Sequence, residues 1–276
     1  MLMIQSMMHS LTKTERKVTD LVTSDPEFVM FASITDVAER AQVGETTVIR
    51  VCRKLGFRGY QEFKLSIAQH MANPQEATSG PIQPSDSLEV ALEKIAAYNA
   101  QTLSDTTKLL TASVVDQAAD MVLSARRVHV VGVGSSGISA QDWQYRLMRV
   151  GIYATCESDS HRIAMICSLT SEHDLVIGIS ASGSTKDVID ALSIAKKQGA
   201  AIICMTNHAR SPITHLSRVA LLTAARESPF QGGALGTKIA QLHVLDALTS
   251  AITLKNYRDA TDAIEKTAQS VVDKLL

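Results

Sequence analysis

The spacing of apolar residues divides the chain into two parts of different structure. Before residue 73 every segment has the three- and four-residue periodicity of helices, whereas after about Arg127 short β-branched runs alternate with amphipathic helices. The second pattern is typical of a parallel α/β sheet. Between the two parts, residues 73–87 are polar and contain three of the six prolines. We therefore predict an all-α domain over residues 1–72, a linker over 73–87, and a doubly wound α/β domain with a parallel sheet over 88–276.

Two short helices of the first domain have the spacing of a helix-turn-helix. Ser33 is a capping residue for a helix that ends near Arg40, residues 42–45 form a turn that contains Gly44, and a second helix follows over residues 46–55. The apolar residues of the second helix recur at helical steps and should pack against the first; they are Val48, Val51 or Cys52, and Leu55. This rotation predicts that residue types suited to base edges and phosphates face a DNA groove, namely Thr46, Thr47, Arg50, Arg53 and Lys54.

The charge of the same segment also favours nucleic acid. Between residues 40 and 64, six basic residues stand against two acidic ones, which gives +4 in a chain whose formal net charge is −1. Arg58 lies just beyond the second helix and is expected to contact a DNA phosphate. The alternative is a three-helix bundle with a solvated basic face, since helix-turn-helix geometry also occurs in proteins that bind no DNA.

A hydroxyl-rich loop follows one of the predicted strands. In DLVIGISASGSTK, residues 174–186, an apolar strand leads into a loop around Gly183, and a helix begins directly after it. The N–H groups and the positive dipole end of such a helix attract anions, and hydroxyls donate to phosphate oxygens. Lys186 lacks the spacing of a nucleotide-triphosphate P-loop, so the expected ligand is a phosphate monoester. A serine-rich turn with no ligand is the alternative. The hydroxyl residues are Ser180, Ser182, Ser184 and Thr185.

A second glycine loop has the GxGxxG spacing of dinucleotide-binding proteins. It is RVHVVGVGSSG, residues 127–137, and Glu157 lies twenty residues beyond it. Taken alone, it would indicate a nicotinamide cofactor and an oxidoreductase. However, Ser135 and Ser136 make it nearly a copy of the other loop, and two hydroxyl-rich loops at neighbouring strand ends suit a small sugar phosphate better than a dinucleotide. We therefore expect no cofactor.

Composition excludes several other classes. The chain has 276 residues, 45% of them hydrophobic, which is enough for one large core and a smaller domain. It has no basic-then-apolar leader and no run that approaches ~20 apolar residues, so we expect a cytoplasmic protein that does not enter membranes. The four cysteines are scattered without a CxxC pair or a zinc-site spacing, which predicts reduced thiols and no metal.

Two phrases of the sequence are specific enough to indicate a family. ETTVIRVCRKLGFRGYQEFK in the first domain and the ISxSGxT loop in the second resemble the RpiR family of bacterial transcription regulators, and the resemblance covers essentially the whole chain. It implies a sugar-isomerase-like (SIS) second domain, a homodimer or higher homo-oligomer, and two further partners, operator DNA and a phosphorylated sugar. Within the family the chain is most similar to the NanR-type sialic acid repressors of vibrios, which implies N-acetylmannosamine 6-phosphate as effector. N-acetylmuramic acid 6-phosphate and glucose 6-phosphate are the alternatives.

The resemblance also assigns residues to the sugar-phosphate site. It implies that the serines and the threonine of the two loops surround the phosphate, and that His161 and Lys238 contact the sugar, unless these two are ordinary surface residues. Glu227 falls where sugar isomerases of this fold have a catalytic glutamate, so an isomerase or an amino-sugar phosphate lyase with Glu227 as base is the rival hypothesis. The fused DNA-binding domain argues against an enzyme, because a repressor must release its effector unchanged.

The implied mechanism is repression of a sugar catabolic operon, relieved by the effector. Long C-terminal helices, including residues 242–252, and parts of the SIS surface are expected to bury apolar faces in a dimer, which sets the two helix-turn-helix domains at the spacing of a palindromic operator. The linker and the amphipathic residues 88–110 would transmit the change that effector binding causes. The sequence alone leaves the sign of regulation open.

Overall fold

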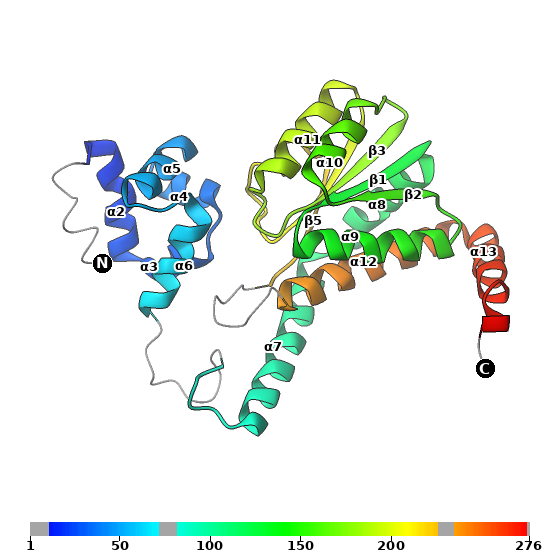
Figure 1. Cartoon of the computed structure of the whole chain (residues 1–276), viewed down its shortest axis with the longest axis horizontal. Helices are drawn as coiled ribbons and strands as arrows, with labels where there is room; N and C mark the ends of the chain where they lie inside the picture. Colours follow the sequence, from blue (N-terminus) through cyan, green and yellow to red (C-terminus); the bar gives the residue numbers. More distant parts are fainter. Residues whose placement is uncertain (1–10, 72–81, 226–234, 275–276) are drawn as a thin grey trace. The chain divides into compact units, whose positions relative to one another are not determined.

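The structure, a computed structural model, describes residues 11–71, 82–225 and 235–274 (Figure 1). It divides into two compact units, one that ends at Asn99 and one that begins at Ala100, so that the helix α7 (Leu88–Leu109) belongs to both. Most of the expected linker lies outside the described residues. The predicted domain limits at residues 72 and 87 therefore stay predictions.

The first unit contains the predicted helix-turn-helix. Its helices are α2 (Lys13–Ser24), α3 (Pro26–Phe31), α4 (Ile34–Arg40), α5 (Glu45–Lys54) and α6 (Tyr60–Met71). Ser33 and Asp36 form a capping box at the start of α4, because each side chain accepts a hydrogen bond from the other's backbone N–H, at 3.0 and 3.3 Å. In the turn, Gln42 adopts a φ of 55°. The helix α5 begins one residue before the predicted start.

Apolar side chains close a common core in this unit. Val18 of α2, Val37 of α4, and Val48 and Val51 of α5 are fully buried and belong to one cluster. The buried hydroxyl of Tyr60 donates to main-chain carbonyls at the end of α3, which ties α6 to α3. The helix-turn-helix is thus fixed from both sides, and the exposed side of α5 is presented on a rigid support.

The second unit is built on a five-stranded parallel sheet. Its strands are β1 (Arg127–Gly132), β2 (Ala154–Glu157), β3 (Asp174–Ile179), β4 (Ala201–Thr206) and β5 (Val219–Leu222), in the order β2-β1-β3-β4-β5. All four strand pairs are parallel. The apolar runs recognised in the sequence are these strands, since both faces of β1 and β3 are buried.

Helices cover both faces of the sheet, which confirms the predicted doubly wound fold. The helices α8 (Ala112–Ser124), α9 (Ser135–Arg149) and α12 (Leu235–Lys255) pack on one face, whereas α10 (Ser160–Ser168) and α11 (Lys186–Lys197) pack on the other (Figure 1). Val130 and Val131 of β1 accordingly belong to different core clusters. The helix α13 (Tyr257–Gln269) and a short 3-10 turn (Val272–Lys274) follow α12.

The prediction that residues 242–252 bury an apolar face in a dimer is wrong for four side chains of this segment. Val244, Leu245, Leu248 and Ile252 of α12 are at most 1% exposed and pack in the core of their own unit. The reason is that α12 lies against both α8 and α9, so its apolar side chains face these helices and the sheet. A partner chain would have to use other apolar surfaces.

A buried carboxylate fastens the start of β3. Asp174 is 1% exposed and accepts hydrogen bonds from Arg127 Nη2 at 2.7 Å and from the backbone N–H of Ser171 at 2.8 Å. These contacts, chiefly the hydrogen bond from Arg127, hold the pKa of Asp174 well below its usual value of 3.8. Because this pKa is lower in the folded than in the unfolded chain, the stabilisation is present at neutral pH and is lost as the pH falls below about 4.

We expect Asp174→Asn to lower the free energy of unfolding by about 1.5–3 kcal/mol at pH 7, since hydrogen bonds to a charged group are lost. The difference from the parent should shrink as the pH falls below about 4, because the unfolded parent chain then takes up a proton at Asp174 while the folded chain keeps this carboxylate ionised. Urea unfolding at a series of pH values measures both effects. Equal stability at pH 7 would contradict the assignment.

Candidate functional sites

The two hydroxyl-rich loops lie at the point where the strand order of the sheet reverses. From β1 the chain goes to β2 at one edge, whereas β3 lies on the other side of β1 and leads on to β4 and β5. Gly132 at the end of β1 pairs with Ile179 at the end of β3, so the loops that follow are neighbours at the carboxyl edge. This switch point is where open α/β sheets bind their ligands.

The loop between β3 and α11 holds its hydroxyls by mutual hydrogen bonds. Ser180 Oγ and Thr185 Oγ1 are 2.8 Å apart. Ser182 Oγ accepts from the backbone N–H of Ser184 at 3.3 Å and from its hydroxyl at 3.2 Å. Ser182, Ser184 and Thr185 are partly exposed, so a ligand at the carboxyl edge can reach them. The helix α11 starts without a side-chain cap, which leaves its first N–H groups for an anion.

Gly183 is required in this loop for two reasons. Its φ is +63°, and a Cβ atom there would lie 2.3 Å from Ser211 Oγ and 2.9 Å from Thr206 Oγ1. The loop packs against the end of β4, where Thr206 Oγ1 and the backbone N–H of Asn207 both donate to the carbonyl of Ala181, at 3.1 and 2.9 Å. These hydrogen bonds fix the position of the loop relative to β4.

The loop between β1 and α9 contributes a second helix start. Gly134 has a φ of 58°, and α9 begins at Ser135 without a side-chain cap. The hydroxyl of Ser135 is buried and has no hydrogen-bond partner among the described residues. Ser136 is 8% exposed, and its Oγ accepts from Gln241 Nε2 of α12 at 3.1 Å. Gln241 in turn accepts from Ser139 Oγ at 2.7 Å, so α12 is tied to the start of α9.

The other predicted sugar contacts are more dispersed. His161 is exposed in the first turn of α10, which follows β2 at the carboxyl edge, and its backbone N–H donates to Asp159 Oδ1 at 3.1 Å. Lys238 is half-buried in the first turns of α12. Glu157 at the end of β2 forms an ion pair with Arg162 at 2.5 Å. Glu227 lies outside the described residues.

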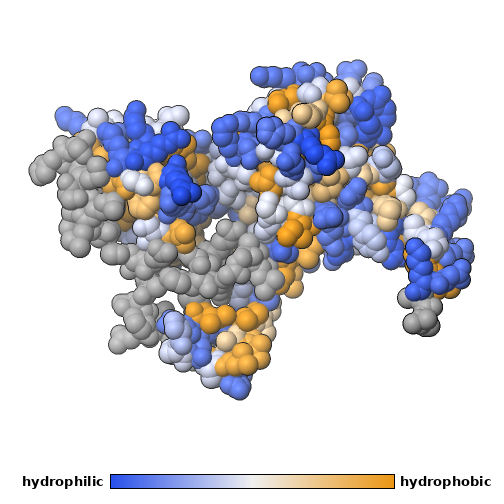
Figure 2. Space-filling view, in the orientation of Figure 1, coloured by the Kyte–Doolittle hydropathy of each residue, from blue (hydrophilic) through white to orange (hydrophobic). Residues whose placement is uncertain are grey.

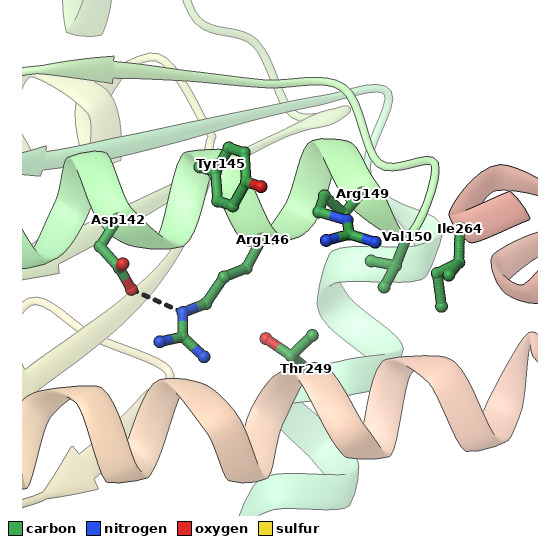
Figure 3. Close-up of a pocket in the computed structure, with 7 residues that line it drawn as sticks. All are labelled: Asp142, Tyr145, Arg146, Arg149, Val150, Thr249 and Ile264. Atoms are coloured by element: carbon green, nitrogen blue, oxygen red, sulfur yellow. Dashed lines mark hydrogen bonds and ion pairs between the residues drawn. The ribbon is translucent and has the colours of Figure 1, made fainter. Parts of the chain in front are cut away.

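A hollow of about 330 Å³ lies on the same unit but away from these loops (Figure 3). Its lining comes from the second half of α9, from α12 and from α13, whereas the serine loop stands before the first turn of α9. Arg146 within it is already paired with Asp142 at 2.5 Å and with Asp246. The hollow therefore contains none of the residues of the two hydroxyl-rich loops. Its lining residues are Asp142, Tyr145, Arg146, Arg149, Val150, Thr249 and Ile264.

The exposed side of α5 is the candidate DNA surface. Thr46, Arg50, Arg53 and Lys54 are exposed, as is Arg58 after the helix. The prediction that Thr47 faces the DNA groove is wrong, because this residue is 8% exposed and does not face outward. It lies one turn before the fully buried Val51 and next to Val48, so it belongs to the wide buried stripe of the helix and not to the groove-facing side.

Comparisons with known proteins match both parts of the chain. A model of the helix-turn-helix domain of the rpiR family matches residues 1–74, and a SIS domain model matches residues 121–251. An uncharacterised HTH-type transcriptional regulator of Haemophilus influenzae is 32% identical over 275 residues, which cover 98% of this chain and 96% of that protein. This chain belongs to the RpiR family. Another relative of this RpiR-family regulator, HexR of Pseudomonas aeruginosa, is 31% identical over 269 residues that cover 98% of this chain and 94% of HexR.

A solved structure resembles the regulator over its whole length. Vibrio vulnificus NanR complexed with ManNAc-6P has a TM-score of 0.86 and 31% identity, with 99% of this chain and 98% of that chain covered. The RpiR-family protein is thus a DNA-binding transcriptional regulator with a SIS domain. Among its described residues, no group of three or more His, Cys, Asp or Glu side chains is placed to hold a metal ion. None of the described helices could span a membrane.

Several residues of the sites were missed from the sequence of this regulator. Thr206 ends an apolar strand and Asn207 follows it, positions that could have identified them as part of the carboxyl edge. Gln241 is a fully buried polar residue on a helix face that is mainly apolar, which is a weaker signal. Glu15, which contacts Arg50 and Lys54 from α2, gives no sequence signal beyond a capping box.

Proposed function

We propose that this RpiR-family regulator represses an amino-sugar catabolic operon, that of sialic acid, and that N-acetylmannosamine 6-phosphate releases it from operator DNA. The observation that carries the proposal is the pair of hydroxyl-rich loops at the β1/β3 switch point, in a chain that also has a basic recognition helix. The similarity to NanR, solved with ManNAc-6P, favours this effector over N-acetylmuramic acid 6-phosphate and glucose 6-phosphate. Relief of repression is favoured over activation, because catabolic operons are commonly induced by an early intermediate.

The phosphate dianion would lie between the starts of α9 and α11. Both helices begin without a side-chain cap, so their first N–H groups and positive dipole ends are available to it. The hydroxyls of Ser182 and Ser184 would donate to its oxygens. The buried, unpartnered hydroxyl of Ser135 supports the same position, because leaving such a group without a hydrogen bond costs about 1–3 kcal/mol and a ligand would supply the partner.

His161 and Lys238 would contact the sugar and determine which sugar phosphate binds. We expect His161→Ala and Lys238→Ala each to lower the affinity for N-acetylmannosamine 6-phosphate about tenfold, since each loss leaves a polar group of the sugar without a partner. Affinity for inorganic phosphate should stay unchanged, because the loop around Gly183 is intact. Isothermal titration with the sugar phosphate, its epimers and inorganic phosphate measures this selectivity.

Two exposed residues at the opposite end of the sheet provide matched controls for these variants. His173 precedes β3 and Lys197 ends α11, so His173→Ala and Lys197→Ala should bind every ligand like the parent. If the His161 and Lys238 variants lose all ligands equally, or lose none, the two side chains do not read the sugar. Glu157 would then be the next residue to replace.

A second copy of the chain would cover two apolar surfaces. On α9, Ile138, Tyr145 and Met148 share one side and are each more than half exposed. On the first half of α7, Leu88 and Leu92 are exposed as well, and Figure 2 shows apolar side chains at the surface of this helix. Exposed apolar side chains gathered on helices are typical of protein contacts, and a homodimer would present two recognition helices to a palindromic operator.

The end of α7 would carry the effector signal towards the DNA-binding unit. Thr106 Oγ1 accepts from the backbone N–H of Ala224, just after β5, at 3.1 Å. Thr107 Oγ1 and His243 Nε2 of α12 are 2.8 Å apart. Since α12 also contacts Ser136 through Gln241, a shift of the serine loops on effector binding reaches α7 through direct hydrogen bonds.

The rival hypothesis is an isomerase or lyase that uses the same phosphate loops. Its base would be Glu227, which lies outside the described residues. The relatives that match over the whole length are named as transcriptional regulators, and a repressor needs its effector unchanged. We therefore propose that the protein is not an enzyme.

A thermal-shift screen across hexose and N-acetylhexosamine 6-phosphates tests the proposal. N-acetylmannosamine 6-phosphate should give the largest shift, because a ligand at 100 times its Kd stabilises by about 2.7 kcal/mol. The same compound should release the protein from a DNA sequence selected from a random pool. Nuclear magnetic resonance of the mixture should show the sugar phosphate unchanged. A larger shift with another sugar phosphate would replace the effector, and formation of a product would favour the enzyme.

A further inference from the structure

A buried carboxylate outside the helix-turn-helix contacts two cations of the recognition helix. Glu15 of α2 is 1% exposed. Its Oε1 accepts from Arg50 Nε at 3.0 Å, and its Oε2 accepts from Lys54 Nζ at 2.8 Å. Arg50 and Lys54 are one turn apart on α5, so a single carboxylate fixes both side chains.

Glu15 itself is held in place by its own helix. It forms a capping box with Thr12, whose backbone N–H donates to Glu15 Oε2 at 2.8 Å, while the backbone N–H of Glu15 donates to Thr12 Oγ1 at 3.3 Å. The hydrogen bond from Lys54, followed by that from the Thr12 backbone, lowers the pKa of Glu15 to about 2. The carboxylate is therefore ionised at any pH used for DNA binding.

The contact leaves the outer edge of Arg50 available. Glu15 contacts only the inner nitrogen, Nε, and neither terminal nitrogen of Arg50 is hydrogen-bonded to another residue in the described part of the chain. The side chain is 58% exposed. A guanidinium is a rigid planar fork, and its two terminal nitrogens can donate together to O6 and N7 of a guanine. Glu15 thus holds the guanidinium of Arg50 by its Nε and leaves both terminal nitrogens able to donate to DNA.

We propose that Glu15 is a positioning residue for DNA recognition, which sets sequence discrimination by holding Arg50 ready to donate to a base edge. The inference rests on the proposed reading of DNA by α5. An Arg side chain that is already fixed loses less conformational freedom when it binds its base, which favours the specific complex. The negative charge of Glu15 also offsets part of the attraction of Arg50 and Lys54 for phosphates, which weakens binding to all sequences alike. The first effect raises the ratio of specific to non-specific affinity, whereas the second lowers both affinities together.

The substitution Glu15→Gln removes the charge and keeps the shape. We expect affinity for a DNA site selected from a random pool to fall about tenfold, while affinity for a shuffled sequence stays equal or rises. Fluorescence anisotropy with both DNAs, over a range of salt concentrations, measures the ratio. The matched control is Asp36→Asn, which removes the capping-box carboxylate of α4 but none of the contacts of Arg50. It should leave the ratio unchanged.

The double variant Glu15→Gln/Arg50→Ala separates positioning from a general structural role. If Glu15 acts through Arg50, the double variant should discriminate no worse than Arg50→Ala alone. Should Glu15→Gln fold poorly, Glu15→Asp keeps the charge and the cap but shortens the reach to Arg50, and the same ratio should fall. An unchanged ratio in a folded Glu15 variant, a loss that persists without Arg50, or an equal loss in Asp36→Asn overturns the inference. If Arg50→Ala itself has no effect, the assignment of α5 fails instead.

Discussion

The Ser182→Ala/Ser184→Ala protein is expected to bind operator DNA like the parent and to ignore the sugar phosphate at concentrations that release the parent. Both hydroxyls lie in the loop between β3 and α11, where they are hydrogen-bonded to each other and partly exposed. Hydrogen bonds to a charged group are worth about 1.5–3 kcal/mol each, so the loss of two corresponds to about 3–6 kcal/mol of effector binding. Titration of the sugar phosphate into labelled operator complex measures the effect.

Two serines outside the loop provide the control for this double variant. Ser193 Oγ donates to the carbonyl of Ile189, and Ser217 Oγ donates to that of Ile213, at 2.8 and 2.9 Å. Replacing both by alanine also removes two hydroxyls from the same unit, and the response to effector should be kept. If Ser182→Ala/Ser184→Ala responded at the parent's effector concentration, the phosphate would have to bind elsewhere in the unit.

Local patterns account for the part of the fold that was predicted correctly. Ser33, Gly44 and the apolar steps of α5 act within a few residues of one another, and the helix-turn-helix was located to within about one residue. Gly183 and the hydroxyls beside it likewise follow from one strand, one turn and one helix start. The sequence therefore carried enough information to locate this loop between a strand and a helix start before any tertiary contact was considered, and its role in phosphate binding stays a prediction.

The errors and omissions concern contacts between distant segments. The rotation of α5 was wrong at Thr47 because a helix packed by α2, α4 and α6 buries a wider stripe than four apolar positions indicate. The dimer face predicted along residues 242–252 was wrong for the four side chains of α12 that α8, α9 and the sheet bury, which periodicity cannot reveal. Gln241 is 102 and 105 residues from the two serines that it contacts, and Glu15 is 35 and 39 residues from its two cations, so only the folded chain brings them together.

The second large effect is expected on the DNA side. In the Arg50→Ala protein, each half-site loses a contact worth about 1–3 kcal/mol, so a homodimer on a palindromic operator loses about 2–6 kcal/mol. Discrimination against a shuffled sequence should fall by the same amount, because the loss concerns a base edge. Arg50 is in the first unit, and the sugar-phosphate loops are in the second, so effector binding should be unchanged. Parent-like operator affinity would show that α5 does not read the DNA.

Arg58→Ala provides a comparison for Arg50→Ala, because the two variants should change different properties of DNA binding. It lies beyond the end of α5, is exposed, and uses its backbone N–H to contact Glu62, so its side chain is suited to a phosphate. Arg58→Ala should weaken binding to operator and shuffled DNA alike, and it should lower the slope of log affinity against log salt by about 1 per protomer. Arg50→Ala should change the discrimination ratio instead. If Arg58→Ala lowered that ratio as strongly as Arg50→Ala, base reading would extend past α5, and the boundary of the recognition surface would have to move.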